Sequence, residues 1–178
     1  MTEAATPDTV LPILIAPHPA LKLRARPVLP SDHAEIAALV PRMFDAMYHA
    51  PGIGLAAPQI GARLRLIVVD LMPGEKREPI VLINPEIMAV STDLFTREEG
   101  CLSLPGQYAD VTRPAAVRVR FLDEAGAKRD LSAEGLLAAC LQHEIDHLDG
   151  VLFVDHLSTL KRNMIMRRLA KEQRLKDH

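Results

Sequence analysis

The stretch Gln142-His143-Glu144-Ile145-Asp146-His147 contains the pattern His-Glu-x-x-His, a compact way to bind a metal ion on a helix. With about 3.6 residues per turn, positions four apart lie on one helix face, so the imidazoles of His143 and His147 can reach the same ion. Glu144 lies beside a ligand without being one, which is where a general base for a metal-activated water belongs. The pattern predicts metal-dependent hydrolysis.

The residues before this motif indicate that it lies on a buried helix. Positions 136–141 read Leu-Leu-Ala-Ala-Cys-Leu and contain no charged residue. The short motif also occurs by chance on amphipathic surface helices, where both histidines are merely solvated. A buried helix favours the metal site, because buried polar groups need partners.

A catalytic site of this kind usually has three protein ligands and leaves one position for water, so a third donor is expected. The longer pattern His-Glu-x-x-His-x-x-Gly-x-x-His is matched at Gly150 but has Phe153 in place of its last histidine. A glutamate from a following helix would have to be Glu172, which lies in a basic tail. Both arrangements are therefore disfavoured.

The two cysteines of the chain differ in their distance from the motif. Cys140 precedes His147 by seven residues, roughly 10.5 Å along a helix, whereas two ligands of one ion lie only about 4 Å apart. Cys140 is therefore expected in the core. Cys101 follows Gly100, a residue that would let the backbone approach closely. Cys101 is therefore the remaining candidate for the third ligand. The alternatives for Cys101 are a role as a small buried hydrophobic residue or a disulfide with Cys140. A Cys-His-His set suits zinc or ferrous iron, and the spacing does not choose between them.

The segment 52–59, Gly-Ile-Gly-Leu-Ala-Ala-Pro-Gln, is rich in small residues. It lacks the third glycine of a nucleotide-binding loop and no strand is evident before it, so phosphate binding is disfavoured. Two glycines and two alanines indicate a backbone held close to another group, and Gln59 could donate a hydrogen bond to a developing oxyanion. Taken alone, the segment is more typical of a tight turn followed by close packing.

Together, these three segments resemble the peptide deformylase family. The family motifs are Gly-x-Gly-x-Ala-Ala-x-Gln, Glu-Gly-Cys-x-Ser and Gln-His-Glu-x-x-Asp-His. Residues 52–59, 99–103 and 142–147 match them in the same order. The resemblance also runs between the motifs and covers most of residues 12–170.

The resemblance assigns roles to individual residues. It implies one divalent metal ion, commonly Fe²⁺ with Zn²⁺, Ni²⁺ or Co²⁺ as substitutes, held by Cys101, His143 and His147. Glu144 would be the general base and later the acid, while the Gln59 side chain and the Leu102 backbone amide would form an oxyanion hole. Glu99 and Arg113 resemble a family ion pair that steadies the cysteine loop, and as an exposed pair it is expected to contribute little to stability.

The resemblance also implies a substrate, the N-formyl group on the initiating methionine of newly synthesised polypeptides, with formate and a free amino terminus as products. The peptide is expected to lie extended along residues 52–59 as an added strand, with its methionine in an apolar pocket. Substrate contacts are expected from Gly52, Ile53, Gly54, Gly100, Tyr108 and Cys140. Two alternatives are a general metallopeptidase, which a cysteine ligand argues against, and a non-catalytic, metal-containing ribosome-binding module, whose closed site would need a fourth ligand.

Three positions depart from the pattern of well-known bacterial relatives. Tyr108 replaces an arginine at the pocket rim, and His18 replaces an acidic residue near the N-terminus. Pro41 interrupts an otherwise helical run over residues 36–47, where a kink or a restart of the helix is expected. None of the three is a proposed metal ligand or the general base, so they do not put activity in doubt.

The composition supports one catalytic domain over residues 1–178, of which 48% are hydrophobic. Residues 1–11 are expected to form a flexible tail. The net charge of -2 argues against general nucleic-acid binding, and no stretch approaches the roughly 20 apolar residues that span a membrane. The first nine residues have no cationic region and do not resemble a secretory or transit signal, so a cytoplasmic protein is expected.

A basic C-terminal helix is predicted over residues 158–178. Residues 161–178 contain seven Lys or Arg and two acidic residues, a formal charge of +5. One side of the pattern is apolar, which is typical of a helix packed on the protein body. The resemblance implies that this helix also docks on the ribosome near the exit of the nascent chain.

The remaining pattern predicts an α+β fold. Residues 64–71, 80–84 and 117–122 read as strands, the last turning back through residues 123–126. Ser31 or Asp32 could cap the first helix, and Ser132 is expected to open the metal-bearing helix. We therefore expect a single domain with short antiparallel or mixed sheets around a central metal-binding helix, followed by the C-terminal helix.

Overall fold

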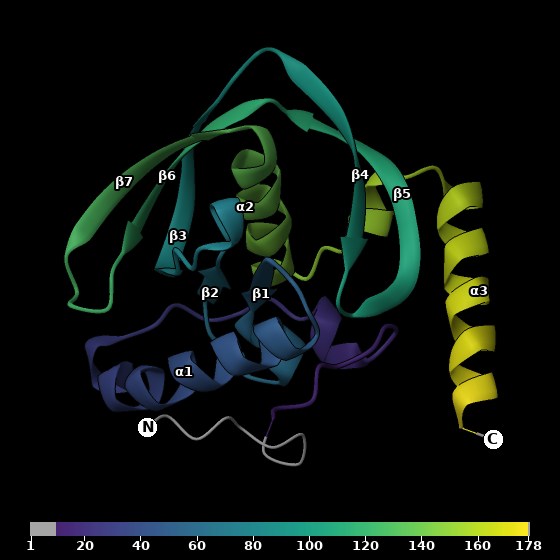
Figure 1. Cartoon of the computed structure of the whole chain (residues 1–178), viewed down its shortest axis with the longest axis horizontal. Coiled ribbons are helices and arrows are strands. Elements are labelled where there is room, and N and C mark those ends of the chain that lie inside the picture. The colour runs from purple at the N-terminus through teal and green to yellow at the C-terminus, as the bar shows by residue number, and fades with distance from the viewer. Residues whose placement is uncertain (1–9, 178) are drawn as a thin grey trace.

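The computed structural model describes residues 10–177 (Figure 1). The flexible tail expected over residues 1–11 therefore falls mostly outside the described residues. Its last two members, Val10 and Leu11, are partly buried and pack against an apolar cluster that includes Ile36 and Met43. None of the helices that the structure describes combines the length and the apolar composition needed to cross a bilayer.

The larger sheet is fully antiparallel and has the strand order β1-β2-β3-β6-β7. Its strands are β1 (Gly54–Ala56), β2 (Leu66–Val69), β3 (Ile80–Val90), β6 (Ala116–Leu122) and β7 (Lys128–Glu134). Asp123 closes the turn between β6 and β7, because its carboxylate accepts hydrogen bonds from the N–H groups of Ala125 and Ala127. Three of these strands overlap the predicted ranges, although β3 runs longer and β2 is shorter than expected.

A second sheet consists of β4 (Leu94–Cys101) and β5 (Leu104–Pro114), which pair antiparallel. The pairing shifts register between Gly100 and Cys101, where the strand pair reaches the candidate site. Within the described residues, three α-helices accompany the sheets: α1 (His33–His49), α2 (Gly135–Leu148) and α3 (Thr159–Lys176). Short 3₁₀ turns cover Pro19–Lys22, Pro30–Asp32, Ala57–Ile60, Pro73–Glu75 and Phe153–His156.

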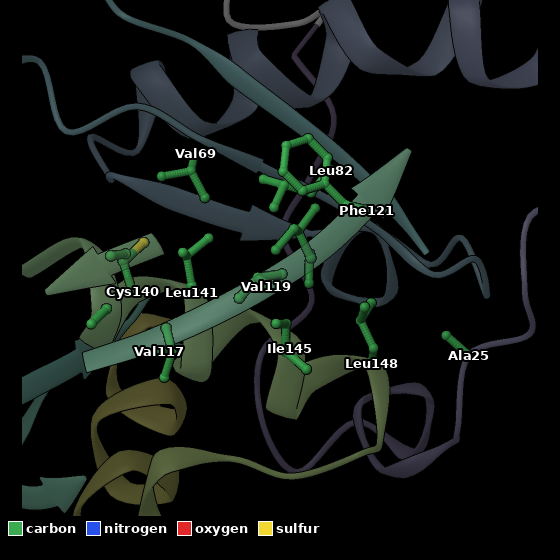
Figure 2. Close-up of a cluster of buried hydrophobic side chains, with 14 residues drawn as sticks. Ala25, Val69, Leu82, Val117, Val119, Phe121, Cys140, Leu141, Ile145 and Leu148 are labelled. Atoms are coloured by element: carbon green, nitrogen blue, oxygen red, sulfur yellow. The ribbon is translucent and has the colours of Figure 1, made fainter. Parts of the chain in front are cut away.

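Helix α2 lies at the centre of the molecule, between the larger sheet and the β4–β5 pair (Figure 1). Its buried apolar residues Ala138, Leu141, Ile145 and Leu148 recur at helical spacing and belong to one cluster with residues of β6, namely Val117, Val119 and Phe121 (Figure 2). At about 100° per residue, His143 and His147 lie on the opposite face. The sheet therefore anchors one side of the helix while the other side carries the motif.

Two expectations about helix boundaries were wrong, and one of the two outcomes expected at Pro41 does not occur. Ser132 does not open the metal-bearing helix, because residues up to Glu134 pair with β6 and α2 begins at Gly135. The first helix does not restart at Pro41, which lies inside the continuous α1. Asp32 stands at the N-cap of α1 without a side-chain cap; its carboxylate instead accepts the N–H of Leu29 and pairs with Arg26.

Candidate metal and substrate site

The cysteine and the two motif histidines meet at one point. One ligand atom each from Cys101, His143 and His147 lies within 4.8 Å of the others. The Sγ atom of Cys101 is 3.3 Å from Nε2 of His147. Cys101 ends β4, while α2 supplies both histidines one turn apart. Cys140 and Cys101 are both free, so the disulfide alternative does not apply.

The protonation of His147 fits a divalent cation. His147 is 1% exposed, and burial lowers the pKa of its imidazole well below the ordinary value, which leaves the neutral form that binds metals. Its Nδ1 atom is buried and finds no hydrogen-bond partner among residues 10–177. Thiolate and imidazole donors together suit zinc or ferrous iron better than magnesium or calcium. The residues present therefore fit the metal that the motif predicts.

Glu99 orients His143, the other histidine of the motif. Nδ1 of His143 lies 3.0 Å from Oε1 of Glu99. Burial alone would raise the pKa of Glu99, but the hydrogen bonds from His143 and Arg113 outweigh it and lower that pKa to about 2. An ionised carboxylate only accepts, so Nδ1 of His143 carries the hydrogen and Nε2 remains free to bind an ion.

The ion pair between Glu99 and Arg113 is buried, which corrects the expectation of an exposed pair. Both side chains are 7% exposed. Arg113 also donates to Oδ2 of Asp146 at 2.9 Å, and Nε2 of His156 lies 2.8 Å from the same oxygen. Helix α2 covers the β4–β5 pair here, so tertiary packing buries charges that a strand pattern alone places at the surface.

Glu144 is positioned and tuned for proton transfer. It is 3% exposed, and its Oε2 atom is buried with no hydrogen-bond partner in the part of the chain that the structure describes. Burial is the main reason that the pKa of Glu144 rises to about 7. Its Oε1 atom lies 3.8 Å from Nε2 of His143. A carboxylate with this pKa can accept and return a proton near neutral pH.

Gln59 points its amide nitrogen toward the cysteine. Its Oε1 accepts the N–H of Ala56 at 2.9 Å, which fixes the amide orientation. Its Nε2 then donates to Oγ of Ser103 at 3.1 Å and lies 3.6 Å from Sγ of Cys101. Gln59 lies in a 3₁₀ turn, which confirms the tight-turn interpretation, while its role as an oxyanion donor stays a prediction. The sequence pattern assigns no role to Ser103, although its place in the cysteine motif is a usable signal.

A pocket of about 620 Å³ opens beside these groups. All the residues expected to contact substrate line this pocket, namely Gly52, Ile53, Gly54, Gly100, Tyr108 and Cys140. Leu102 and Glu144 line it as well. A Cβ atom on Gly54 would lie 2.9 Å from Cys140 Sγ, and one on Gly52 would lie 2.7 Å from Leu102 Cδ1. The glycines therefore allow the close backbone approach that the segment predicted.

The lining residues that sequence reasoning missed include Arg97, Leu136 and Ala139. The helical period places Leu136 and Ala139 on the face of His143, so that signal was present. Tyr108 is 61% exposed at the rim. His18 lies elsewhere, where its Nδ1 accepts the N–H of Ala20 at the start of a 3₁₀ turn.

The central helix, the Cys-His-His cluster and the buried carboxylate in a pocket define a metal-dependent hydrolase of the α+β class. A family model described as Polypeptide deformylase matches residues 10–163. The chain belongs to this family. Deformylation of N-formyl-methionyl peptides is the family's activity, and the general peptidase and the non-catalytic module are accordingly not favoured.

Individual relatives agree with this placement. A peptide deformylase of Agrobacterium fabrum is 49% identical over 169 residues, which cover 94% of this chain and 99% of the relative. One of Rhizobium meliloti is 51% identical over 164 residues, covering 92% and 94%. The crystal structure of a Legionella pneumophila peptide deformylase has a TM-score of 0.89 at 49% identity and covers 95% and 98%. A Synechococcus elongatus peptide deformylase in complex with actinonin has a TM-score of 0.85 at 44% identity, covering 92% and 89%.

Proposed function

We propose that this chain removes the N-formyl group from the N-terminal methionine of nascent polypeptides, using the pocket beside Glu144. The proposal is carried by an oxygen of Glu144 that has no hydrogen-bond partner within residues 10–177 and lies next to the cluster of Cys101, His143 and His147. Those three residues would hold one divalent ion. When bound, the ion supplies Lewis acidity that lowers the pKa of water toward neutrality and polarises the formyl oxygen.

Glu144 moves the proton in this scheme. With a pKa of about 7, its carboxylate can take a proton from water as the oxygen attacks the formyl carbon. The protonated carboxyl then returns that proton to the amide nitrogen as the C–N bond breaks. Formate and a free amino terminus leave, and Glu144 is again ionised. One water molecule is consumed for each formyl group removed.

Gln59 and Leu102 would stabilise the charge that develops on the formyl oxygen. Nε2 of Gln59 is already aimed at the cysteine because Ala56 fixes its amide. The backbone N–H of Leu102 follows Cys101 directly in the chain and would be the second donor. Preorganised donors of this kind act in the transition state at no reorganisation cost.

The peptide would enter along β1. This strand pairs with β2 on one side and stands at the edge of the larger sheet, so an extended peptide can add on its other side. Its methionine would occupy the apolar part of the pocket, near Ile53 and Cys140. Tyr108 would contact residues after the methionine, because its ring lies exposed at the rim.

Fe²⁺ is the metal we favour, because the donor set suits it and the family commonly uses it. A ferrous thiolate site is sensitive to oxygen. Activity lost in air by the iron form but retained by the nickel form would support the assignment. Equal activity of the zinc and iron forms, both stable in air, would count against it.

Helix α3 would dock on the ribosome in the cytoplasm. Ile165 and Leu169 bury one side of the helix against the body, while Arg167, Arg168 and Arg174 are exposed. An exposed basic face suits the phosphate backbone of ribosomal RNA. Replacing these three arginines by glutamate should abolish co-sedimentation with ribosomes without loss of formate release from short peptides. Unchanged co-sedimentation would contradict this contact.

The proposed activity is tested with anaerobically purified protein and a formyl-methionyl tripeptide. We expect stoichiometric formate and a tripeptide that is shortened by the formyl group alone. An unformylated peptide serves as the control, with mass spectrometry of the products. Cleavage of its internal amide bonds would instead indicate a general metallopeptidase.

A further inference from the structure

Arg97 lies where the substrate pocket meets a second, smaller cavity of about 80 Å³. Arg97, Glu99 and Ala139 line both spaces. Side chains alternate along a strand, so Arg97 and Glu99 share one face of β4. Arg97 is four residues from Cys101, roughly 13 Å along the strand. It therefore stands at the end of the pocket that lies away from the metal ligands.

The guanidinium of Arg97 is not neutralised by its carboxylate neighbour. Both oxygens of Glu99 are taken, Oε2 by Arg113 at 2.7 Å and Oε1 by Arg113 and His143 at 3.0 Å each. Nε of Arg97 is buried and has no partner among the described residues. The Cζ atom of Arg97 lies 5.1 Å from the centroid of the Phe95 ring, which holds the group by stacking.

The facing wall of the pocket is apolar. Leu136 and Ala139 lie on the pocket side of α2, three residues apart. A polar atom placed between this wall and β4 would lose its water, and that loss is costly without a hydrogen-bond donor. Arginine carries five N–H donors and no acceptor. The end of the pocket thus combines apolar surface with one source of donors.

We propose that Arg97 is a specificity-determining residue, which lets the pocket accept a first side chain of methionine length that carries a hydrogen-bond acceptor near its end. Methionine sulfoxide is such a side chain, since oxidation converts the apolar thioether into a polar S=O group. The inference rests on the proposed deformylase function. The reaction is the same hydrolysis: water adds across the formyl C–N bond, formate leaves, and the sulfoxide is unchanged.

The test compares two tripeptides that differ only in the first side chain, N-formyl-norleucyl and N-formyl-methionine-sulfoxide peptides, the latter as separate epimers. The readout is the ratio of kcat/KM for the faster sulfoxide epimer over norleucine. In the wild-type protein we expect a ratio within about threefold of one. Arg97→Met, which keeps length but removes the donors, should lower the ratio by about ten- to hundredfold. Arg118→Met, at an exposed arginine of β6, should leave it unchanged.

Two results would overturn the proposal. The first is a wild-type kcat/KM ratio of sulfoxide over norleucine that is about a hundredfold below one. This result does not depend on any variant. The other is an equal ratio in wild type and Arg97→Met. Arg97→Lys is a second variant in case Arg97→Met does not fold, and it should lower the ratio less because one cationic donor remains. If neither tripeptide nor a formyl-methionyl peptide releases formate, the proposed deformylase function itself is refuted. If the norleucyl peptide releases formate but the kcat/KM ratio is the same in wild type and Arg97→Met, only the role of Arg97 is overturned.

Discussion

The Arg113 guanidinium holds the Glu99 carboxylate through two hydrogen bonds, Nε to Oε2 at 2.7 Å and Nη2 to Oε1 at 3.0 Å. Glu99 in turn accepts a hydrogen bond from Nδ1 of His143 at 3.0 Å. The pair therefore connects the β4–β5 strands to a proposed metal ligand on α2. Because both partners are buried, each charge depends on the other for compensation.

Breaking this pair should destabilise the protein strongly. Arg113→Met leaves the Glu99 charge buried and is expected to lower the free energy of unfolding by about 3 to 5 kcal/mol. The double variant Glu99→Met/Arg113→Met should recover part of that loss. Urea denaturation measures both. Arg120→Met is the matched control, because the Arg120–Asp130 pair is about half exposed (49% and 53%), and it should cost at most about 1 kcal/mol. Equal costs for Arg113→Met and Arg120→Met would contradict the argument.

The two cysteines should separate cleanly in a metal analysis. Cys101→Ala removes a proposed ligand, and we expect the purified protein to lose its ion. Cys140→Ala alters the pocket wall but no ligand, and it should retain one ion per chain. Elemental analysis of both variants after identical anaerobic purification gives the answer. Full metal content in Cys101→Ala would reopen the identity of the third ligand.

Gln59 should act in the transition state more than in substrate binding. Gln59→Ala removes a proposed oxyanion donor, so kcat should fall by about a hundred- to a thousandfold with little change in KM. Ser103→Ala removes only a hydrogen-bond partner of Gln59 and should cost much less. Steady-state kinetics with a formyl-methionyl peptide distinguishes them. If Gln59→Ala raised KM at constant kcat, Gln59 would be a binding residue.

The motif helix could be predicted from the sequence better than the strands could. The motif helix and the closeness of its two histidines could be predicted because the helical period places His143 and His147 together wherever the helix lies. The strand β7 could not, since its polar residues include Ser132 and Glu134, which also suit a helix start. Its pairing with β6 is a long-range contact that overrides local preference. The positive φ of Gly135, at 61°, marks the boundary.

Burial was the property that sequence patterns described least well. The Glu99–Arg113 contact was predicted but its burial was not, because the cover comes from α2, which lies far along the chain. Exposure, in turn, explains why Pro41 is tolerated inside α1. It lies on the exposed side of the helix, so water can satisfy the Ala37 carbonyl that its missing N–H leaves free.

Tyr48 should make stability depend on pH in the alkaline range. Its hydroxyl donates to the fully buried carboxylate of Asp70, and burial followed by that bond raises the pKa of Tyr48 to about 12. The unfolded pKa is about 10, so the contribution is complete below pH 10 and is lost as pH rises through about 12. The stability difference between wild type and Tyr48→Phe should therefore shrink by roughly 1 kcal/mol between pH 9 and pH 11.

Urea unfolding at each pH measures this difference. Tyr108 is the other tyrosine of the chain and is 61% exposed, so Tyr108→Phe is the control and should show a constant difference. A difference for Tyr48→Phe that stays constant or grows with pH would contradict the role of the Tyr48–Asp70 bond.

The most direct test measures formate release and metal content on the same anaerobic samples of wild type and Glu144→Gln, with Glu124→Gln in the exposed β6–β7 turn as control. We predict one bound ion in all three proteins, rapid formate release by wild type and Glu124→Gln, and a rate at least about a hundredfold lower for Glu144→Gln. Glu144→Gln with its ion and a near-native rate would contradict the central claim that this carboxylate moves the proton.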